Sequence, residues 1–253
     1  MIQIKNKEQL SLMKQASRIV GEALLLARES VREGISTWEL DRIIREFIEK
    51  SGAVPSFLNY NGFPASTCIS INDEVIHGIP SKKRILEAGD IVSIDVGAKY
   101  RGFHGDAART IPVGKVSREA SRLIDVARKS FFEGIDKAVV GNRIGDIGHA
   151  IQSFVEGEGY SVVRTYIGHG VGQELHEQPD VPNYGLPGRG VRLCAGMTLA
   201  IEPMINAGRY EVVTDPGGWT VRTADRSLSA HYENTVAITE DGPCVFTLCD
   251  PDW

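Results

Sequence analysis

Two parts of the sequence repeat at one common offset, and this repeat restricts the possible folds more than any other feature of the chain. Residues 34–52, GISTWELDRIIREFIEKSG, align with residues 141–159, GNRIGDIGHAIQSFVEGEG, 107 positions later. The same offset aligns residues 86–97, LEAGDIVSIDVG, with residues 193–204, LCAGMTLAIEPM. One offset shared by two separate segments indicates an internal duplication. We therefore expect two α/β halves that pack about a pseudo-twofold axis.

The duplicated segments carry acidic residues at the same strand position, since Asp95 aligns with Glu202. No Gly/Ser-rich or Pro-rich linker separates the halves, and two long copies are too few for a solenoid. We therefore predict a single domain, residues 1–253, with pseudo-symmetric halves of approximately 7–110 and 117–240.

Hydrophobic residues recur at spacings of three and four in four parts of the sequence, a pattern typical of amphipathic helices. The predicted helices are residues 7–30, the segment from Ser36 to Gly52, residues 117–138 and residues 143–156. Ser36 begins a capping-box sequence, Ser-Thr-Trp-Glu, and Gly52 is the expected C-terminal stop. Together with the strand-like segments, these helices indicate an α+β fold.

Composition and charge exclude several classes of protein. With 42% apolar and 24% charged residues, the chain is typical of globular proteins. Its net charge of −5 argues against a surface that grips nucleic acid. No stretch fits an export signal or a membrane span, and the four cysteines lack CxxC spacing. We expect a cytoplasmic monomer with reduced thiols that binds neither nucleic acid nor membranes.

An acidic side chain interrupts an otherwise apolar strand. Asp95 lies in the middle of residues 91–98, IVSIDVGA, and Asp106 follows eleven residues later. If residues 91–98 and 103–110 form a hairpin, we expect Asp95 directly opposite Asp106, with Cβ atoms roughly 4.5–5.5 Å apart. Two carboxylates at that distance repel each other, and the repulsion grows as water is excluded.

Two further carboxylates are expected in the same interior. Glu202 joins them by the duplication, and Glu233 lies in another alternating strand, AHYENTVAIT, at residues 230–239. Arg109 is the nearest basic residue and would neutralise one of the four charges. Two divalent cations would neutralise all four, and carboxylates that bridge two metals about 3.5–4 Å apart are a recognised hydrolytic arrangement.

A histidine in a glycine-rich bend offers a nitrogen ligand for such a site. His169 is flanked by Gly168 and Gly170, so the backbone can approach a metal closely there. A lone histidine is more often structural, but the acidic surroundings favour a ligand here. Manganese, iron(II), cobalt and zinc all suit four carboxylates and one imidazole, and the spacing does not choose among them.

Five stretches of the sequence resemble the methionine aminopeptidase family over nearly the whole chain and in the family's order. They are NGFPASTCISINDEVIHGIP, SIDVGAKYRGFHGDAART, GHGVGQELHEQP, MTLAIEPM and HYENTVAIT. The resemblance implies the pita-bread fold, in which a curved antiparallel sheet carries helices on its outer face and has internal pseudo-twofold symmetry.

The resemblance also implies the metal ligands and the reaction. Two divalent ions would be bound by Asp95, Asp106, His169, Glu202 and Glu233. Asp106 and Glu233 would bridge the ions. Asp95 would bind one ion, and His169 and Glu202 the other. A bridging hydroxide would then attack the carbonyl of the first peptide bond.

Three residues would assist this attack by analogy with the family. Glu202 would accept the proton, His176 would stabilise the developing oxyanion, and His77 would position the scissile amide. All three lie within the stretches that carry the resemblance.

The resemblance implies a pocket for the methionine side chain. Its residues would be Tyr60, Phe63, Cys68 and Trp219, and His77 and His176 would also bind the substrate. Phe57 and Leu175 would border the pocket, where a thioether makes favourable sulfur–aromatic contacts. For Tyr60 or Phe63 alone, a role as an ordinary core aromatic is an equal alternative. Leu175 and Asn61 depart from the family's usual phenylalanine and histidine, which affects the pocket's shape rather than its chemistry.

The implied function is removal of the N-terminal methionine from nascent proteins and peptides, near the ribosome, when the second residue is small. Proline-specific and creatinase-like relatives usually carry an extra N-terminal domain, for which we expect no room. Glu202 and Glu233 are only 31 residues apart, which favours the shorter first type of methionine aminopeptidase. We also expect no N-terminal zinc-finger extension, which favours a bacterial-style enzyme. Two alternatives are a non-catalytic binding module and a di-iron redox protein, although the latter is built on four-helix bundles.

Overall fold

The helices of the computed structural model, which describes residues 2–250 and 253, agree closely with the predicted ones. They are α1 (Lys7–Ser30), α2 (Thr37–Lys50), α3 (Arg118–Ile135) and α4 (Ile144–Gly157). The side chain of Ser36 caps α2 by accepting a hydrogen bond from the N–H of Glu39. Helix α3 ends three residues before its predicted end, because the chain turns at Asp136 and Lys137. No helix within the described ranges combines the length and apolar character needed to cross a bilayer.

The strands form four antiparallel groups over the described residues. In the first, β4 (Ile91–Tyr100) pairs with β1 (Val54–Pro55), β2 (Thr67–Ile71) and β5 (Phe103–Pro112). The second runs in the order β15 (Gly242–Val245), β14 (Asn234–Thr239), β9 (Thr198–Ile201), β7 (Gly168–Gly170) and β8 (Glu177–Val181). The third is β13 (Ser229–His231), β10 (Met204–Asn206) and β6 (Ser161–Val162), and the fourth is β11 (Val212–Thr214), β12 (Val221–Thr223) and β3 (Glu74–Ile76).

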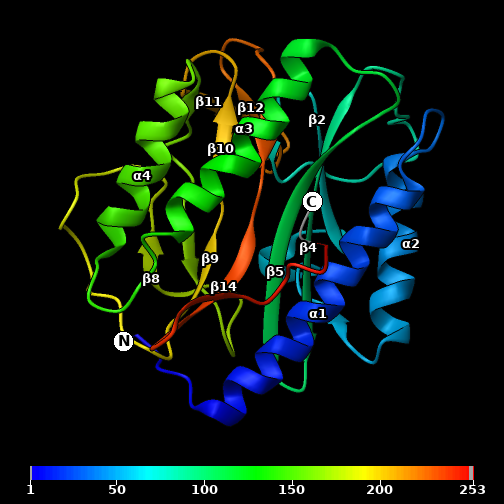
Figure 1. Cartoon of the computed structure of the whole chain (residues 1–253). Helices are drawn as coiled ribbons and strands as arrows, with labels where there is room; N and C mark the ends of the chain where they lie inside the picture. Colours follow the sequence, from blue (N-terminus) through cyan, green and yellow to red (C-terminus); the bar gives the residue numbers. More distant parts are fainter. Residues whose placement is uncertain (1, 251–252) are drawn as a thin grey trace.

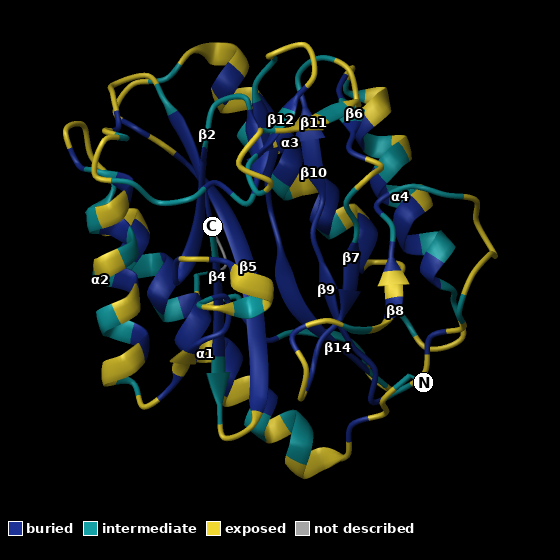
Figure 2. Cartoon of the chain, turned by 180° about the vertical axis from the view of Figure 1, so that it is seen from behind, coloured by how far each residue is buried: buried dark blue, intermediate teal, exposed yellow. Residues whose placement is uncertain are grey.

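The helices lie on one face of these strands (Figure 1). One hydrophobic core joins Leu24 of α1 and Ile44 of α2 to β4, and another joins Phe131 of α3 and Ile151 of α4 to β9. Seen from behind, strands β5, β9 and β14 are almost entirely buried, and β4 is buried over most of its length (Figure 2). Each half thus has its own helix pair, and the strands between them form the interior of the molecule.

The repeat at an offset of 107 residues extends beyond the segments that revealed it. Both ends of α2 match both ends of α4, and β1 matches β6. The isolated bridge between Ser36 and Ile85 recurs between Arg143 and Arg192. Strand β4 corresponds to β9 and β10 together, because its second copy is interrupted at Glu202 and the following proline.

Strand β5 has a second copy as well, but at an offset of 125 residues. Asp106 of β5 pairs with Gly97 of β4. Its counterpart His231 of β13 pairs with Met204, which lies 107 residues after Gly97. Strands β13 and β14 together are therefore the second copy of β5.

The pseudo-twofold axis passes between β5 and β14. Ala108 and Glu233 are related by the offset of 125 residues and exchange both backbone hydrogen bonds, with N···O distances of 3.0 and 3.4 Å. Symmetry-equivalent residues can bond reciprocally only beside the axis that relates them. The two halves thus meet along these strands, in the interior of the molecule.

The hairpin of β4 and β5 has a different register from the predicted one. Asp95 pairs with Ala108 and Gly97 pairs with Asp106, so the predicted direct opposition of the two aspartates is wrong. The turn residues Arg101-Gly102 determine this register, because both have positive φ, 49° and 86°, as a two-residue type I′ turn requires. The aspartates still share one face as diagonal neighbours, a relation that typically separates Cβ atoms by about 7–8 Å.

The contact between α1 and β5 gives a test of this packing. A Cβ atom on Gly105 would lie 2.6 Å from the Cα of Ser17. We predict that Gly105→Ala lowers the free energy of unfolding by about 1–3 kcal/mol, because the added methyl forces backbone shifts. Urea denaturation measures the change. Gly157→Ala is the control, since no atom lies within 4 Å of its added Cβ. Equal losses in both variants would contradict the close contact.

Candidate metal centre and active site

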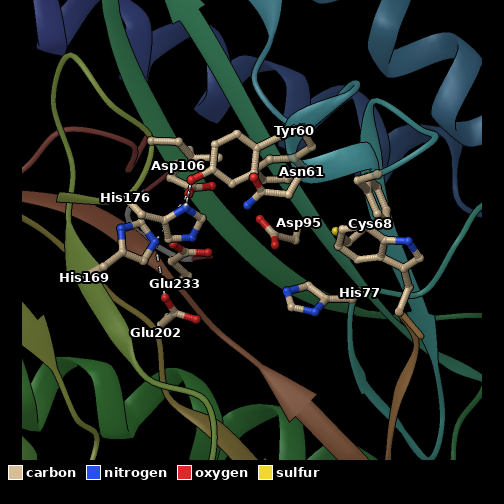
Figure 3. Close-up of a pocket in the computed structure, with 14 residues that line it drawn as sticks. Tyr60, Asn61, Cys68, His77, Asp95, Asp106, His169, His176, Glu202 and Glu233 are labelled. Carbon is tan, nitrogen blue, oxygen red and sulfur yellow. Dashed lines mark hydrogen bonds and ion pairs between the residues drawn. The ribbon is translucent and has the colours of Figure 1, made fainter. Parts of the chain in front are cut away.

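Carboxylates and imidazoles from both halves converge in one pocket (Figure 3). The predicted metal ligands come from five places: Asp95 from β4, Asp106 from β5, His169 from β7, Glu202 after β9, and Glu233 just before β14. His77 and His176 line the same pocket. The structure therefore brings together residues that span most of the sequence.

Glu202 and Glu233 face each other across an opening in the strand ladder. Strand β9 pairs with β14, and β10 continues the same register with β13. Glu202-Pro203, between β9 and β10, and Tyr232-Glu233, between β13 and β14, belong to no strand. Pro203 lacks an N–H to donate to the ladder. Both glutamates line the pocket at this opening.

Several buried polar atoms in or beside the pocket have no hydrogen-bond partner among the residues that the structure describes. They are Oδ1 of Asp95, Oδ1 of Asp106 and Nε2 of His231. The Nε2 atom of His169 lies 3.6 Å from Oε1 of Glu202 and 3.8 Å from Oδ2 of Asp106. These separations are too long for hydrogen bonds, but they suit two ligands of one ion at about 2.0–2.2 Å each.

The donor atoms form two groups that share one residue. Asp106, His169 and Glu233 make the first group, and Asp95, His231 and Glu233 make the second. Within each group the donor atoms lie within 4.8 Å of one another. Buried carboxylate oxygens without partners are costly, and oxygen ligands with an imidazole suit divalent transition metals. The residues present therefore fit divalent cations.

Burial controls the charge of the acidic residues. It raises the pKa of Asp106, Glu202 and Glu233 well above the ordinary range, and neighbouring carboxylates raise each pKa further. Burial raises the pKa of Asp95 as well. Without cations, these groups keep protons at pH values where free carboxyl groups have released them.

Arg109 turns away from the pocket, contrary to the expectation that it neutralises one of the carboxylates. It lies on the opposite face of β5 from Asp106, because side chains alternate along a strand. Its guanidinium donates to the backbone carbonyl of Glu233 and to Oδ1 of Asn234, and it stacks 4.1 Å from the ring centre of Tyr232. Its charge lowers the pKa of Glu233, but burial and the neighbouring carboxylates outweigh this effect.

Close backbone contacts hold His169 in position. A Cβ atom on Gly168 would lie 2.3 Å from the carbonyl oxygen of Ala200, and one on Gly170 would lie 2.4 Å from that of Gln178. The Nδ1–H of His169 donates to the carbonyl of Gly170 at 2.8 Å, which leaves Nε2 free to bind a metal. Burial lowers the pKa of His169 to about 3, so its imidazole is neutral.

The other two predicted histidines lie at the same pocket. Nδ1 of His176 is 2.8 Å from the hydroxyl of Tyr60, and burial lowers the pKa of His176. His77 has φ of 58°, which is rare outside glycine and is often found at functional sites. Its ring packs edge-on against Tyr166 and Trp219, and burial lowers its pKa to about 4.

An apolar cluster forms the other wall of the pocket. Its members are Phe57, Phe63, Ala65, Cys68 and Leu175, with Tyr60, Ile79 and Trp219 packed against them. The rings of Phe63 and Trp219 meet edge to face at 5.1 Å. Cys68 pairs with Asp95 across β2 and β4, so the apolar wall adjoins the carboxylates. Burial raises the pKa of the Cys68 thiol, which is therefore neutral.

The sequence predictions omitted one residue of the site, His231, and noted two departures from the family, Leu175 and Asn61. Leu175 is buried in the apolar cluster, whereas Asn61 is exposed at the pocket. His231 belongs to the second donor group and was not predicted. The sequence does indicate His231, because it lies two residues before Glu233 and the alternation of side chains along a strand puts both residues on one face.

Comparison with known proteins agrees with a site that binds divalent cations. The model of metallopeptidase family M24 matches residues 11–240. A methionine aminopeptidase from Clostridium acetobutylicum is 56% identical, over 99% of this chain and 100% of that protein. Methionine aminopeptidase 1 from Bacillus subtilis is 50% identical, over 98% and 99% respectively.

Solved structures agree with the fold. Methionine aminopeptidase from Thermotoga maritima superposes with a TM-score of 0.96 at 44% identity, over 98% of this chain and 99% of that one. Prolidase from Pyrococcus furiosus gives a TM-score of 0.77 at 25% identity, over 98% of this chain but 66% of the longer prolidase. The predicted pita-bread fold is confirmed.

The raised pKa of Asp95 predicts a pH-dependent effect of removing its charge. Burial shifts this pKa from 3.8 to about 7, so the metal-free protein keeps a proton that the unfolded chain releases. The proton on Asp95 should therefore make the stability fall as pH rises from about 3.8 to about 7, and its share of the slope is at most about 1.4 kcal/mol per pH unit. Asp95→Asn has no such proton and should become the more stable protein in urea denaturation as pH rises.

Adding a divalent ion should reverse this order. At a free concentration 100 times its dissociation constant, an ion stabilises the folded state by about 2.7 kcal/mol. The wild type should gain this amount with Mn²⁺ or Co²⁺, whereas Asp95→Asn should gain less. Asp241→Asn, at an exposed position, is the control and should follow the wild type throughout. Equal gains in wild type and Asp95→Asn would remove Asp95 from the metal site.

Proposed function

The chain belongs to metallopeptidase family M24 and is a metal-dependent aminopeptidase of the methionine aminopeptidase kind, and we propose that it removes N-terminal methionine when the second residue is small. One observation carries this proposal. The carboxylate cluster and the apolar wall form a single pocket, joined where Cys68 pairs with Asp95. A methionine side chain on that wall would hold its own peptide bond beside the carboxylates.

Two divalent ions would be held by the five predicted ligands. Asp106 and Glu233 would lie between the ions, Asp95 would bind one ion, and His169 and Glu202 would bind the other. The two donor groups support a place for Glu233 at both ions and the separation of Asp95 from His169. When bound, the ions supply a Lewis acid and lower the pKa of water towards neutrality. Manganese, iron(II), cobalt and zinc all accept such ligands.

Glu202 is suited to move the proton of the attacking water. Its Oε1 faces His169 and its Oε2 faces His231, 3.8 Å from Nε2, so the carboxylate lies at the centre of the site. It is 9% exposed, whereas Glu233 is 2% exposed, so Glu202 is nearer to the open pocket. We assign Glu202 to accept the proton from water and to deliver it to the departing amine.

His176 would donate a hydrogen bond to the carbonyl oxygen as negative charge develops on it. Because its pKa is lowered, the ring is neutral and carries a single proton. The nearby hydroxyl of Tyr60 decides where that proton lies. We assign the hydroxyl of Tyr60 as the donor to Nδ1, so that the proton of His176 is on Nε2 and available to the substrate. His77, in its left-handed conformation, would position the scissile amide.

The apolar wall would select the methionine side chain. An unbranched thioether adapts to an irregular pocket, and sulfur makes favourable contacts with the aromatic rings of Phe63 and Trp219. The neutral Cys68 thiol adds a further polarisable surface. Leu175, in place of the phenylalanine usual in the family, leaves this wall less aromatic and would alter its fit to the side chain.

The substrates would be the N-termini of nascent polypeptides, and the enzyme would act on them in the cytoplasm, near the ribosome. Residues 1–253 would form one catalytic domain, with halves of approximately 7–110 and 117–240, and would act as a monomer. The helix and strand repeats at offsets of 107 and 125 residues support this division.

Hydrolysis of short peptides tests the function. With Mn²⁺, Fe²⁺, Co²⁺ or Zn²⁺, we expect the protein to release methionine from Met-Ala-Ser but not from Met-Lys-Ser. Asp106→Asn is the matched control, and its activity should be lost because a proposed bridging ligand is removed. Release from both peptides would contradict the proposed selectivity. No release with any metal, or oxygen consumption without cleavage, would favour the binding or redox alternatives.

The pairing of Tyr60 with His176 predicts a specific kinetic effect. Tyr60→Phe keeps the ring but removes the hydroxyl, so the proton of His176 is no longer fixed on Nε2. We expect kcat on Met-Ala-Ser to fall at least about tenfold, short of the roughly 100- to 1,000-fold cost of removing an oxyanion donor outright. KM should change little. Tyr210→Phe, at an exposed position, is the control, and a wild-type kcat for Tyr60→Phe would refute the role.

A further inference from the structure

His231 is a buried imidazole beside the carboxylates of the pocket, and the proposed mechanism does not use it. It is 2% exposed, and its Nε2 has no hydrogen-bond partner among the described residues. This atom lies 3.8 Å from Oε2 of Glu202 and 3.9 Å from Oε2 of Glu233, too far for a hydrogen bond. His104, which is also buried, has its Nδ1 2.8 Å from Oγ of Ser56. His104 is thus held by a hydrogen bond within the protein, whereas Nε2 of His231 has none among the described residues. The orientation of His231 therefore needs another explanation.

The pseudo-twofold symmetry makes His231 the counterpart of Asp106, a proposed metal ligand. The two residues are held in the same way. The hydroxyl of Thr110 accepts from the N–H of His231 and donates to its carbonyl. The hydroxyl of Thr235, 125 residues after Thr110, makes the same two hydrogen bonds to Asp106. The second half therefore presents His231 to the site where the first half presents a carboxylate.

The distances around His231 match those around His169. Each Nε2 lies 3.6–3.9 Å from carboxylate oxygens, and the two histidines face the two different oxygens of Glu202. Each histidine also completes one of the two donor groups that share Glu233. We propose that Nε2 of His231 is a ligand of the metal ion bound by Asp95, so that each ion has one imidazole. This inference rests on the proposed two-metal site.

An imidazole would change the preference of the ion at Asp95. The five-ligand set implied by the family gives that ion only carboxylates, which suit harder cations such as Mn²⁺. A nitrogen ligand raises affinity for Co²⁺, Fe²⁺ and Zn²⁺, which accept imidazole readily. His231 would therefore tighten the binding of these ions at the site and reduce the advantage of Mn²⁺ there.

Cobalt-loaded protein allows the ligated histidines to be counted without an activity assay. Paramagnetic Co²⁺ shifts the NMR resonances of ring protons on imidazoles that bind it. With selectively labelled histidine, we expect two strongly shifted imidazoles in wild type, and one in each of His231→Gln and His169→Gln. Titration calorimetry should show one Co²⁺ site weakened at least about tenfold in His231→Gln, since loss of even outer partners of ligands costs 10- to 100-fold. His104→Gln, a buried histidine outside the donor groups, should retain both signals.

One ligated imidazole in wild type, lost in His169→Gln, would overturn the assignment of His231. The number of ligated imidazoles in the wild type and the His169→Gln spectrum test the assignment even if His231→Gln does not fold. The result is separable from failure of the proposed function, because a wild type that binds two Co²⁺ and releases methionine with one ligated imidazole contradicts His231 alone. A wild type that neither binds Co²⁺ nor cleaves Met-Ala-Ser contradicts both.

Discussion

Repulsion among four buried carboxyl groups is the constraint on which the rest of this structure depends. Asp95 and Asp106 come from the first half, and Glu202 and Glu233 from the second. Protonated carboxyl groups relieve the repulsion but are poor ligands, whereas ionised ones need cations nearby. Because each half supplies only part of the set, neither can build the centre alone. The burial of β5 against β14 is therefore part of the chemistry as well as of the fold.

The features that the sequence predicted correctly are those that depend on local periodicity. The apolar spacing located all four helices, and one offset related α2 to α4 before any packing was known. Alternation along β4 and β5 predicted that Asp95 and Asp106 share a face, and it would have included His231 with Glu233. Such patterns can be recognised in the sequence because the period of a helix or strand determines which residues face the core.

The features that could not be predicted depend on where the chain turns and on contacts between distant segments. The first-half hairpin turns at Arg101-Gly102, which fixes its register, whereas its second copy replaces that turn with a long connection containing β11 and β12. This insertion changes the offset from 107 to 125 residues and hides the equivalence of Asp106 and His231. The pairing of Tyr60 with His176, 116 residues apart, follows only from the packed pocket.

The two halves have diverged where the chemistry requires unequal positions. Strand β4 runs unbroken past Asp95, but its second copy opens at Glu202, where a continuous ladder would hold that residue directly opposite Glu233, with Cβ atoms about 4.5–5.5 Å apart. Glu233 also bonds across the pseudo-twofold axis to Ala108, its own counterpart. A side chain beside the axis is nearly equidistant from two sites that the axis relates. This position explains why Glu233 belongs to both donor groups.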